Sequence, residues 1–228
     1  GVVGSFILDK EESDTDAFTF KHHYITGAID SGVLASLFTA MREKRAVTIS
    51  NMSRRIDLPR KNRIIPLRVF ISVQSGRQYL MAYSPEQNRI RAFRLDYLSG
   101  VKIEEPTPRF GELRARLDAL EPSLWGVFIK DRGGKTEQVS FTVKVGQNEG
   151  YIVDRLEREK RTGQVECLAP GLYRFSATVQ DAGELRPWIR TFLCRIVSFE
   201  CSNPRVKEQF LEDLRAMYAL YGLGGDSV

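Results

Sequence analysis

Basic and aromatic side chains alternate in one short segment of the sequence. Arg89, Arg91 and Phe93 are spaced two residues apart, and Arg94 follows directly. In a β-strand alternate residues share a face, so we expect the first three to point one way and Arg94 the other. Guanidinium groups bind phosphate and stack on bases, and an aromatic ring beside them suits an unstacked base. The segment therefore predicts contacts with a nucleotide or single-stranded nucleic acid. The same pattern also fits a strand with Phe93 in the core and solvated arginines.

Charge is unevenly distributed along the 228 residues, whose net charge is +5. Residues 1–41 contain 2 basic and 6 acidic side chains, a net charge of −4. Residues 42–102 contain 14 and 4, which gives +10, and residues 103–228 contain 18 and 19, which gives −1. A basic excess confined to one segment is typical of binding to a polyanion or an anionic surface, although an arginine-rich solvated surface has the same composition.

Residues for other chemistries are sparse. The only histidines are His22 and His23, so a catalytic triad has a single narrow source of base. Cys167, Cys194 and Cys201 lack zinc-site spacing, and such a sparse, odd number fits a reducing compartment. The chain has neither a Walker A loop nor a dinucleotide-binding glycine motif. We therefore expect no catalytic residues, no cofactor and no metal.

The overall composition is that of a globular chain. It is 42% hydrophobic and 28% charged, which excludes a wholly disordered protein. No apolar run reaches the roughly 18 residues that a transmembrane helix needs, and the N-terminus lacks a signal-peptide pattern. We therefore expect a cytoplasmic protein without a membrane partner.

The elements around the basic segment are short. An acidic, aperiodic stretch at 1–27 predicts a linker. Asp30 is a candidate N-cap for an amphipathic helix at 31–44. Five strands follow, at 46–51, 64–73, 78–84, 89–95 and 101–104, with turn chemistry at 54–62, 74–76, 85–88 and 99–100. Five short strands in about sixty residues predict a small, strongly bent β-barrel.

The second half of the sequence changes its order of elements. A helix at 109–120 and a glycine-containing hinge at 131–135 precede a strand at 139–145, a helix at 149–160, strands at 164–167 and 173–180, a helix at 184–192, a strand at 195–200 and a helix at 204–221. Pro187 should kink the helix at 184–192 or mark its start. The order β-α-β-β-α-β-α is that of ferredoxin-like domains, so we predict an α+β chain. The expected parts are a linker at 1–27, a helix plus barrel at 28–106, a helix and hinge at 107–135, and an αβ extension at 136–222.

Several stretches resemble the WYL domain of bacterial regulators. The Trp-Tyr-Leu that names the family appears as Gln78-Tyr79-Leu80, and the pattern Arg-any-Phe-Arg-Leu-Asp-Arg-Ile appears as the run Arg91–Leu98. Residues 66–70 and 75–83 match the preceding pattern. The runs Glu184–Arg190 and Pro204–Tyr221 are similar to the extension that follows WYL domains. The resemblance covers roughly residues 28–222.

The resemblance implies a small Sm-like or SH3-like barrel with a ligand pocket, followed by an αβ extension used in homodimerisation. WYL proteins are typically transcription regulators that contact DNA through an N-terminal winged helix-turn-helix. Their WYL domain senses single-stranded nucleic acid or a nucleotide-like effector. No winged helix fits before Ser31, so we expect either a fragment of a longer regulator or an effector module. The alternative is a stand-alone RNA- or single-stranded-DNA-binding accessory protein of the CRISPR-associated WYL type.

The resemblance also assigns candidate binding residues. Tyr79 takes the signature tyrosine position, and Arg91 and Arg94 take two arginine positions; core packing is the alternative role of Tyr79. Arg68 and Arg89 are further candidates from their strand positions, and Ser50 is another because it lies where the family often has a tyrosine at the end of the first strand. Two departures from the family pattern matter for binding. Gln78 replaces the tryptophan and removes a stacking surface, and Tyr97 replaces a third arginine, which removes a phosphate contact and adds a ring.

Overall fold

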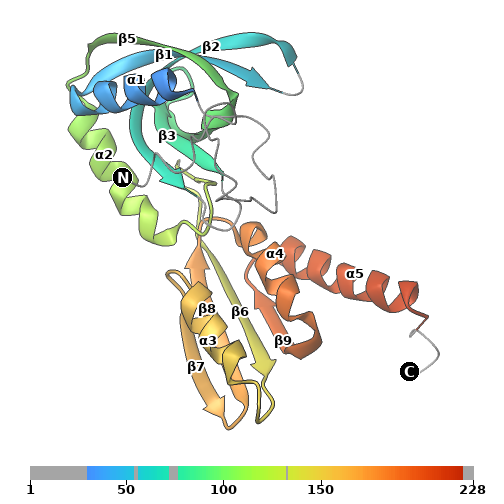
Figure 1. The fold of residues 1–228 in the computed structure, drawn as a ribbon. Helices are drawn as coiled ribbons and strands as arrows, with labels where there is room; N and C mark the ends of the chain where they lie inside the picture. Colours follow the sequence, from blue (N-terminus) through green and yellow to red (C-terminus); the bar gives the residue numbers. More distant parts are fainter. Residues whose placement is uncertain (1–29, 54–55, 72–76, 132, 223–228) are drawn as a thin grey trace, which may run out of the picture. The chain divides into compact units, whose positions relative to one another are not determined.

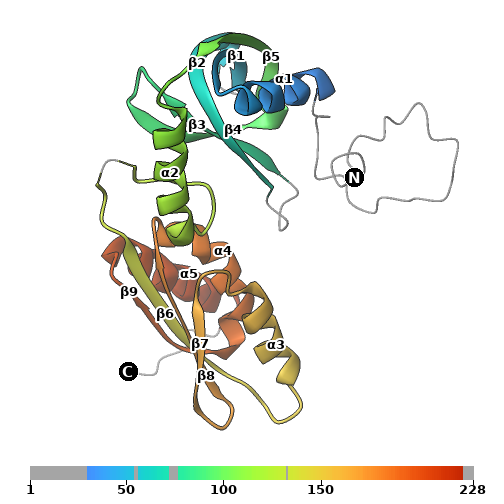
Figure 2. The same cartoon turned by 90° about the vertical axis from the view of Figure 1, so that its left-hand side faces the viewer.

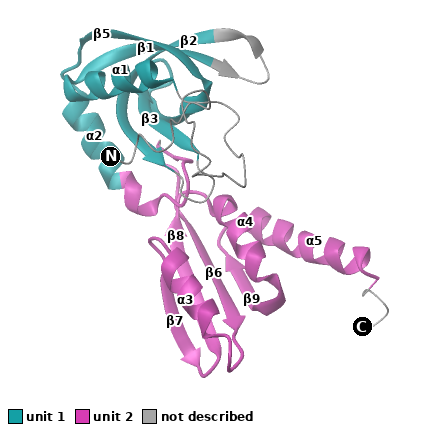
Figure 3. Cartoon of the chain, in the orientation of Figure 1, with its two compact units in different colours: residues 1–119 teal, residues 120–228 magenta. Residues whose placement is uncertain are grey.

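The computed structural model describes residues 30–53, 56–71, 77–131 and 133–222 (Figure 1). The chain divides into two compact units, residues 1–119 and 120–228 (Figure 3). Each contains one antiparallel sheet with helices, so the chain is a mixed α+β protein, as predicted. The finer domain bounds given above, including the hinge at 131–135, stay predictions.

The first unit begins with a capped helix. The Asp30 side chain accepts hydrogen bonds from the backbone N–H groups of Gly32 and Val33, at 2.7 and 3.1 Å, and thereby satisfies two N–H groups that have no partner within α1. The elements that follow are α1 (Ser31–Arg42), β1 (Arg45–Ser53), β2 (Ile56–Ile71), β3 (Gln78–Ser84), β4 (Arg89–Arg94), the 3₁₀ turn η2 (Leu95–Tyr97), β5 (Leu98–Pro106) and α2 (Phe110–Leu120). The helix at 31–44 and all five strands were predicted.

Strand β2 is longer than predicted, and the loop predicted at 54–62 is wrong over 56–62. This part of β2 pairs with β1, as in the register pairs Ser50–Lys61 and Ser53–Ile56. Pro59, which favoured a loop, falls within a register shift of this ladder, where a missing N–H is tolerated. The second part of β2 pairs with β3 instead. One 16-residue strand thus serves both halves of the sheet.

The strand order of the first sheet is β4-β3-β2-β1-β5, with antiparallel neighbours. Among the described strands no register pair joins β4 to β5, so closure of the predicted barrel stays an expectation. Figure 2 shows α1 beneath the curved strands β1, β2 and β5. Four α1 side chains pack in one core with strand residues that include Val47, Ile49, Ile64, Leu80 and Phe93. We call the face of β3 and β4 that carries Leu80 and Phe93 the inner face, and the opposite one the outer face.

Helix α2 is anchored to β2. Phe110, Leu113 and Leu117 are buried on one side of α2. The Arg68 guanidinium is 2.7 Å from Oδ1 of Asp118, and the Arg114 guanidinium donates to the backbone carbonyl of Leu67. Two arginines therefore tie the helix to the strand by charge and by hydrogen bonding.

The second unit has the predicted order of elements. After η3 (Glu121–Ser123) come β6 (Glu137–Lys144), α3 (Gly150–Glu159), β7 (Gln164–Ala169), β8 (Leu172–Val179), η4 (Ala182–Leu185), α4 (Arg186–Ile189), η5 (Arg190–Arg195), β9 (Ile196–Cys201) and α5 (Pro204–Leu220). The strand order is β7-β8-β6-β9, all antiparallel. The helix predicted at 184–192 is four α-helical residues between two 3₁₀ turns, with Pro187 near its start.

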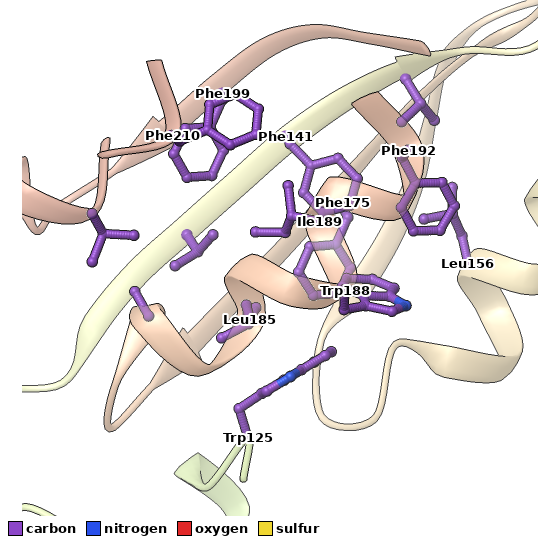
Figure 4. Close-up of a cluster of buried hydrophobic side chains, with 14 of the residues drawn as sticks. Trp125, Phe141, Leu156, Phe175, Leu185, Trp188, Ile189, Phe192, Phe199 and Phe210 are labelled. Atoms are coloured by element: carbon purple, nitrogen blue, oxygen red, sulfur yellow. The ribbon is translucent and has the colours of Figure 1, made fainter. Parts of the chain in front are cut away.

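An aromatic cluster fills the core of this unit (Figure 4). The centre of the Trp188 ring lies 5.0 Å from those of Trp125 and Phe175, and its Nε1 donates to Glu159 at 2.7 Å. A buried indole therefore has both ring partners and an acceptor for its N–H.

Two charged residues of the run Glu184–Arg190 also have structural roles. The Glu184 carboxylate accepts hydrogen bonds from the backbone N–H groups of Gly126 and Val127, at 2.9 and 3.0 Å. Arg190 forms an ion pair with Asp213 of α5. The run that resembles the WYL extension therefore holds the 126–127 segment and α5 in place.

Candidate functional site

The register of β3 and β4 decides which predicted residues share a face. Tyr79 lies directly opposite Arg94, and Ala82 lies opposite Arg91. Residues directly opposite one another in an antiparallel pair project to the same side. Tyr79 and Arg94 are therefore on the outer face, whereas Arg91 lies on the inner face with Phe93. This confirms the predicted alternation and divides the candidate site into two groups.

On the outer face, Arg94 has two partners from the turn that follows it. Its Nε donates to Oδ1 of Asp96 at 3.0 Å, and a second guanidinium nitrogen donates to Oδ2. Its guanidinium carbon lies 4.0 Å from the centre of the Tyr97 ring. The hydrogen bond to Asp96 raises the pKa of Arg94, against a smaller opposing effect of burial. The guanidinium is thus already held by a carboxylate and an aromatic ring.

On the inner face, Arg91 is half-buried and lies 5.4 Å from the centre of the Phe93 ring. Desolvation lowers the pKa of Arg91, and repulsion from Arg89 lowers it further. No carboxylate of the described residues forms an ion pair with Arg91, in contrast to Arg63, which pairs with Glu104 at 2.7 Å. A desolvated cation beside a second cation is stabilised by an incoming anion.

The remaining candidates are distributed differently. Arg89 is exposed, and its Nε donates to the side chain of Gln87 at 3.1 Å. It lies two residues from Arg91 and on the same face of β4. Arg68 is committed to Asp118 and anchors α2. Ser50 lies on β1 opposite Lys61 and Gly100, and two strands separate β1 from β4 in the sheet. The structure therefore joins Arg89 with Arg91, and Tyr79 with Arg94; Arg68 and Ser50 belong to neither pair.

Sequence reasoning missed the role of Asp96 and did not assign Gln78 to a face of β3. Asp96 follows Arg94 by two residues, a spacing that can signal an ion pair, but only the turn η2 brings the groups together. Gln78 shares the inner face with Leu80, and its side-chain oxygen is buried without a hydrogen-bond partner among the described residues. The change from tryptophan at this position therefore alters the inner face of β3 and not the face that carries Tyr79.

A cavity of about 750 Å³ lies elsewhere, on the second sheet, and contains none of the predicted residues. Its walls include Ser140, Gln164, Arg174, Ser176 and Glu200. Arg174 and Ser176 flank the buried Phe175 on β8, as expected for the solvated face of an antiparallel sheet. The cavity is therefore lined by residues other than the β4 arginines and is not part of their site.

The part of the chain that the structure describes shows neither a metal-ligand cluster nor a membrane-spanning helix. It contains no group of three or more His, Cys, Asp or Glu side chains that could hold a metal ion. None of its helices is long and apolar enough to span a membrane. His22 and His23 lie outside the described residues, so the absence of catalysis stays a prediction.

Comparison with known proteins gives one family match. Residues 32–103 match the model of the WYL domain. No curated protein matches the chain. Among solved structures, proteasome accessory factor B/C (PafBC) of Arthrobacter aurescens is 17% identical with a TM-score of 0.32, over 71% of this chain and 23% of that one. A CRISPR Cas-related protein is 15% identical with a TM-score of 0.51, over 85% of this chain and 52% of that one. The chain thus spans about half the length of the second structure, whose fold it shares.

Proposed function

Because the chain carries a WYL domain over residues 32–103, we propose that its first unit binds single-stranded nucleic acid or a nucleotide-like effector. The chain then acts as the ligand-sensing and dimerisation module of a transcription regulator. The observation that carries this proposal is the environment of Arg91, a half-buried guanidinium without a carboxylate partner among the described residues.

The chemistry around Arg91 supports a phosphate-bearing ligand. A phosphate oxygen offers the charge-assisted hydrogen bonds that Arg91 lacks. Arg89, on the same face of β4, adds a second cation, and Phe93 supplies a ring below the Arg91 guanidinium. The basic segment at 42–102, with its net charge of +10, surrounds these residues in the sequence. Such a surface attracts polyanions before any specific contact forms.

Titration of the full chain with a short fluorescein-labelled oligothymidylate tests this function. We expect binding that weakens as salt rises, with a slope of log K against log salt of about −1.4 for two phosphate contacts. Absence of binding to single-stranded oligonucleotides and to mononucleotides at low salt would contradict the proposed function.

The finer fold assignments are also proposals. The order β4-β3-β2-β1-β5, the long bent β2 and the 3₁₀ turn between β4 and β5 support an Sm-like or SH3-like barrel. The order β7-β8-β6-β9 with helical connections supports a ferredoxin-like second unit. If the barrel is closed, the backbone amides on the edge of β4 that is not paired with β3 should be protected from hydrogen exchange. Rapid exchange along that edge would contradict closure.

Dimerisation is proposed to use helix α5. Phe210, near its start, is buried and lies 4.3 Å from Phe199 between ring centres. Further along, Leu211, Tyr218 and Tyr221 are exposed at spacings that keep them on one side of a helix. An exposed apolar stripe that continues from a packed region supports pairing with a second copy of the chain.

A further inference from the structure

The turn η2 gives Arg94 the two contacts that a nucleotide would give it. We propose that Asp96 and Tyr97 act as an internal stand-in for ligand, which keeps Arg94 out of phosphate binding and leaves the phosphate to Arg91 and Arg89. Arg94 is then a positioning residue for the turn. The effector is accordingly a mononucleotide, or a single-stranded nucleic acid that presents few phosphates to the inner face of β4. This inference rests on the proposed function.

The stand-in has the chemistry of the groups it replaces. The two carboxylate oxygens of Asp96 accept from two guanidinium nitrogens, which is the geometry in which arginine binds a phosphate. The Tyr97 ring lies 4.0 Å from the guanidinium carbon, where a base would stack. The Asp96 carboxylate therefore accepts hydrogen bonds from the edge of the Arg94 guanidinium, and the ring of the next residue stacks on its face.

Competition with this stand-in is difficult for a ligand. The Arg94 and Asp96 side chains are only 25% and 19% exposed, so separating them leaves two poorly solvated charges. Asp96 is tethered two residues away, so its effective concentration at Arg94 exceeds that of a dissolved phosphate. Arg91 has no such competitor among the described residues, and an incoming phosphate reaches it without breaking an ion pair.

Position 97 makes this arrangement specific to the chain. The WYL pattern resembled by residues 91–98 has arginine at this position, where the present sequence has Tyr97. An arginine at 97 would place a second cation beside Asp96 and would supply no ring to cover Arg94. Tyr97 therefore lacks the phosphate-binding charge of the family's arginine and instead places a ring over the Arg94 guanidinium.

The salt dependence of oligothymidylate binding tests the stand-in, because its slope counts phosphate contacts at about −0.7 each for single strands. Asp96→Asn releases Arg94 and should steepen the slope by about 0.7. Glu105→Gln, which makes the same change in charge beside Arg63, is the matched control and should leave the slope unchanged. The double variant Arg94→Ala/Asp96→Asn restores the net charge and should return to the wild-type slope.

The outcomes separate this inference from the proposed function. If the double variant has a slope flatter than wild type by about 0.7, Arg94 already binds phosphate and the stand-in is overturned. Equal slopes for Asp96→Asn and Glu105→Gln would overturn it as well. Absence of binding by the wild type and every variant would instead overturn the proposed function. Thermal melts of each variant establish that the compared chains are folded.

Discussion

Tyr79 and Arg94 face each other across β3 and β4, while Arg91, three residues before Arg94, projects to the opposite side of the sheet. A ligand that stacks on Tyr79 and one that binds Arg91 thus approach different faces. Because Arg94 is already paired with Asp96, the outer face offers a tyrosine but no free β4 guanidinium. The inner face of β4, which carries Arg91 and Arg89, is therefore the site where we expect phosphate to bind.

Arg68 should prove structural and not ligand-binding. Arg68→Met removes the partly exposed ion pair with Asp118, so we expect a loss of about 1 kcal/mol or less in the free energy of unfolding. Oligothymidylate affinity should stay unchanged. Urea unfolding and fluorescence titration of the same preparation measure both quantities. A large loss of affinity with unchanged stability would show that Arg68 binds the ligand and would contradict this prediction.

Tyr97→Arg should convert the outer face toward the family pattern. The new arginine removes the ring that covers Arg94 and competes with it for Asp96. We expect stronger oligothymidylate binding at low salt and a slope steeper by about 0.7 for the one added phosphate contact. Tyr97→Phe, which keeps the ring, is the control and should behave as wild type. A slope for Tyr97→Arg equal to that of Tyr97→Phe would contradict the prediction.

Acid should destabilise the first unit through Glu104. Hydrogen bonds from Thr48 and then from Arg63 lower the pKa of Glu104 below its usual 4.5. A carboxyl whose pKa is lower in the folded state stabilises the fold above the unfolded-state pKa, and this stabilisation is lost as pH falls through the folded-state value. Glu104→Gln should therefore flatten the decline in melting temperature below about pH 4.5. An unchanged decline would show that other carboxyls cause it.

The exposed stripe of α5 should control oligomeric state. Tyr218→Glu places a charge among apolar side chains that, in a dimer, would be buried. Sedimentation velocity should show a wild-type dimer and a 26.0 kDa monomer for the variant. Ala216→Glu, which adds the same charge at an exposed position on the other side of α5, is the control. A wild type that sediments as a monomer at micromolar concentration would contradict the proposed interface.

Local sequence signals predicted most elements of the fold. Asp30 marked the start of α1, and the alternation around Phe93 correctly assigned Arg91 and Arg94 to opposite faces. The length of β2 was missed because Pro59 favours a loop, whereas the ladder with β1 extends past it. Local preference gave way there to tertiary pairing.

The candidate site was predictable only in part. Residue type identified the arginines, but their partners depend on contacts that composition does not encode. Arg68 reaches Asp118, 50 residues later in the sequence, and Arg94 is neutralised by a turn whose geometry is not apparent from the letters Leu-Asp-Tyr. Strand parity could have placed Gln78 opposite to Tyr79, since neighbouring residues of a strand face opposite sides.

The affinity of Arg91→Ala for oligothymidylate tests the central claim most directly. Loss of the guanidinium should weaken binding by about 5- to 150-fold, the equivalent of about 1–3 kcal/mol, and flatten the salt slope by about 0.7. Arg42→Ala removes the same charge from an exposed position on α1 and should change the affinity far less. If Arg91→Ala binds as tightly as Arg42→Ala, with the same salt dependence and an unchanged melting temperature, Arg91 does not read the phosphate and the assignment is wrong.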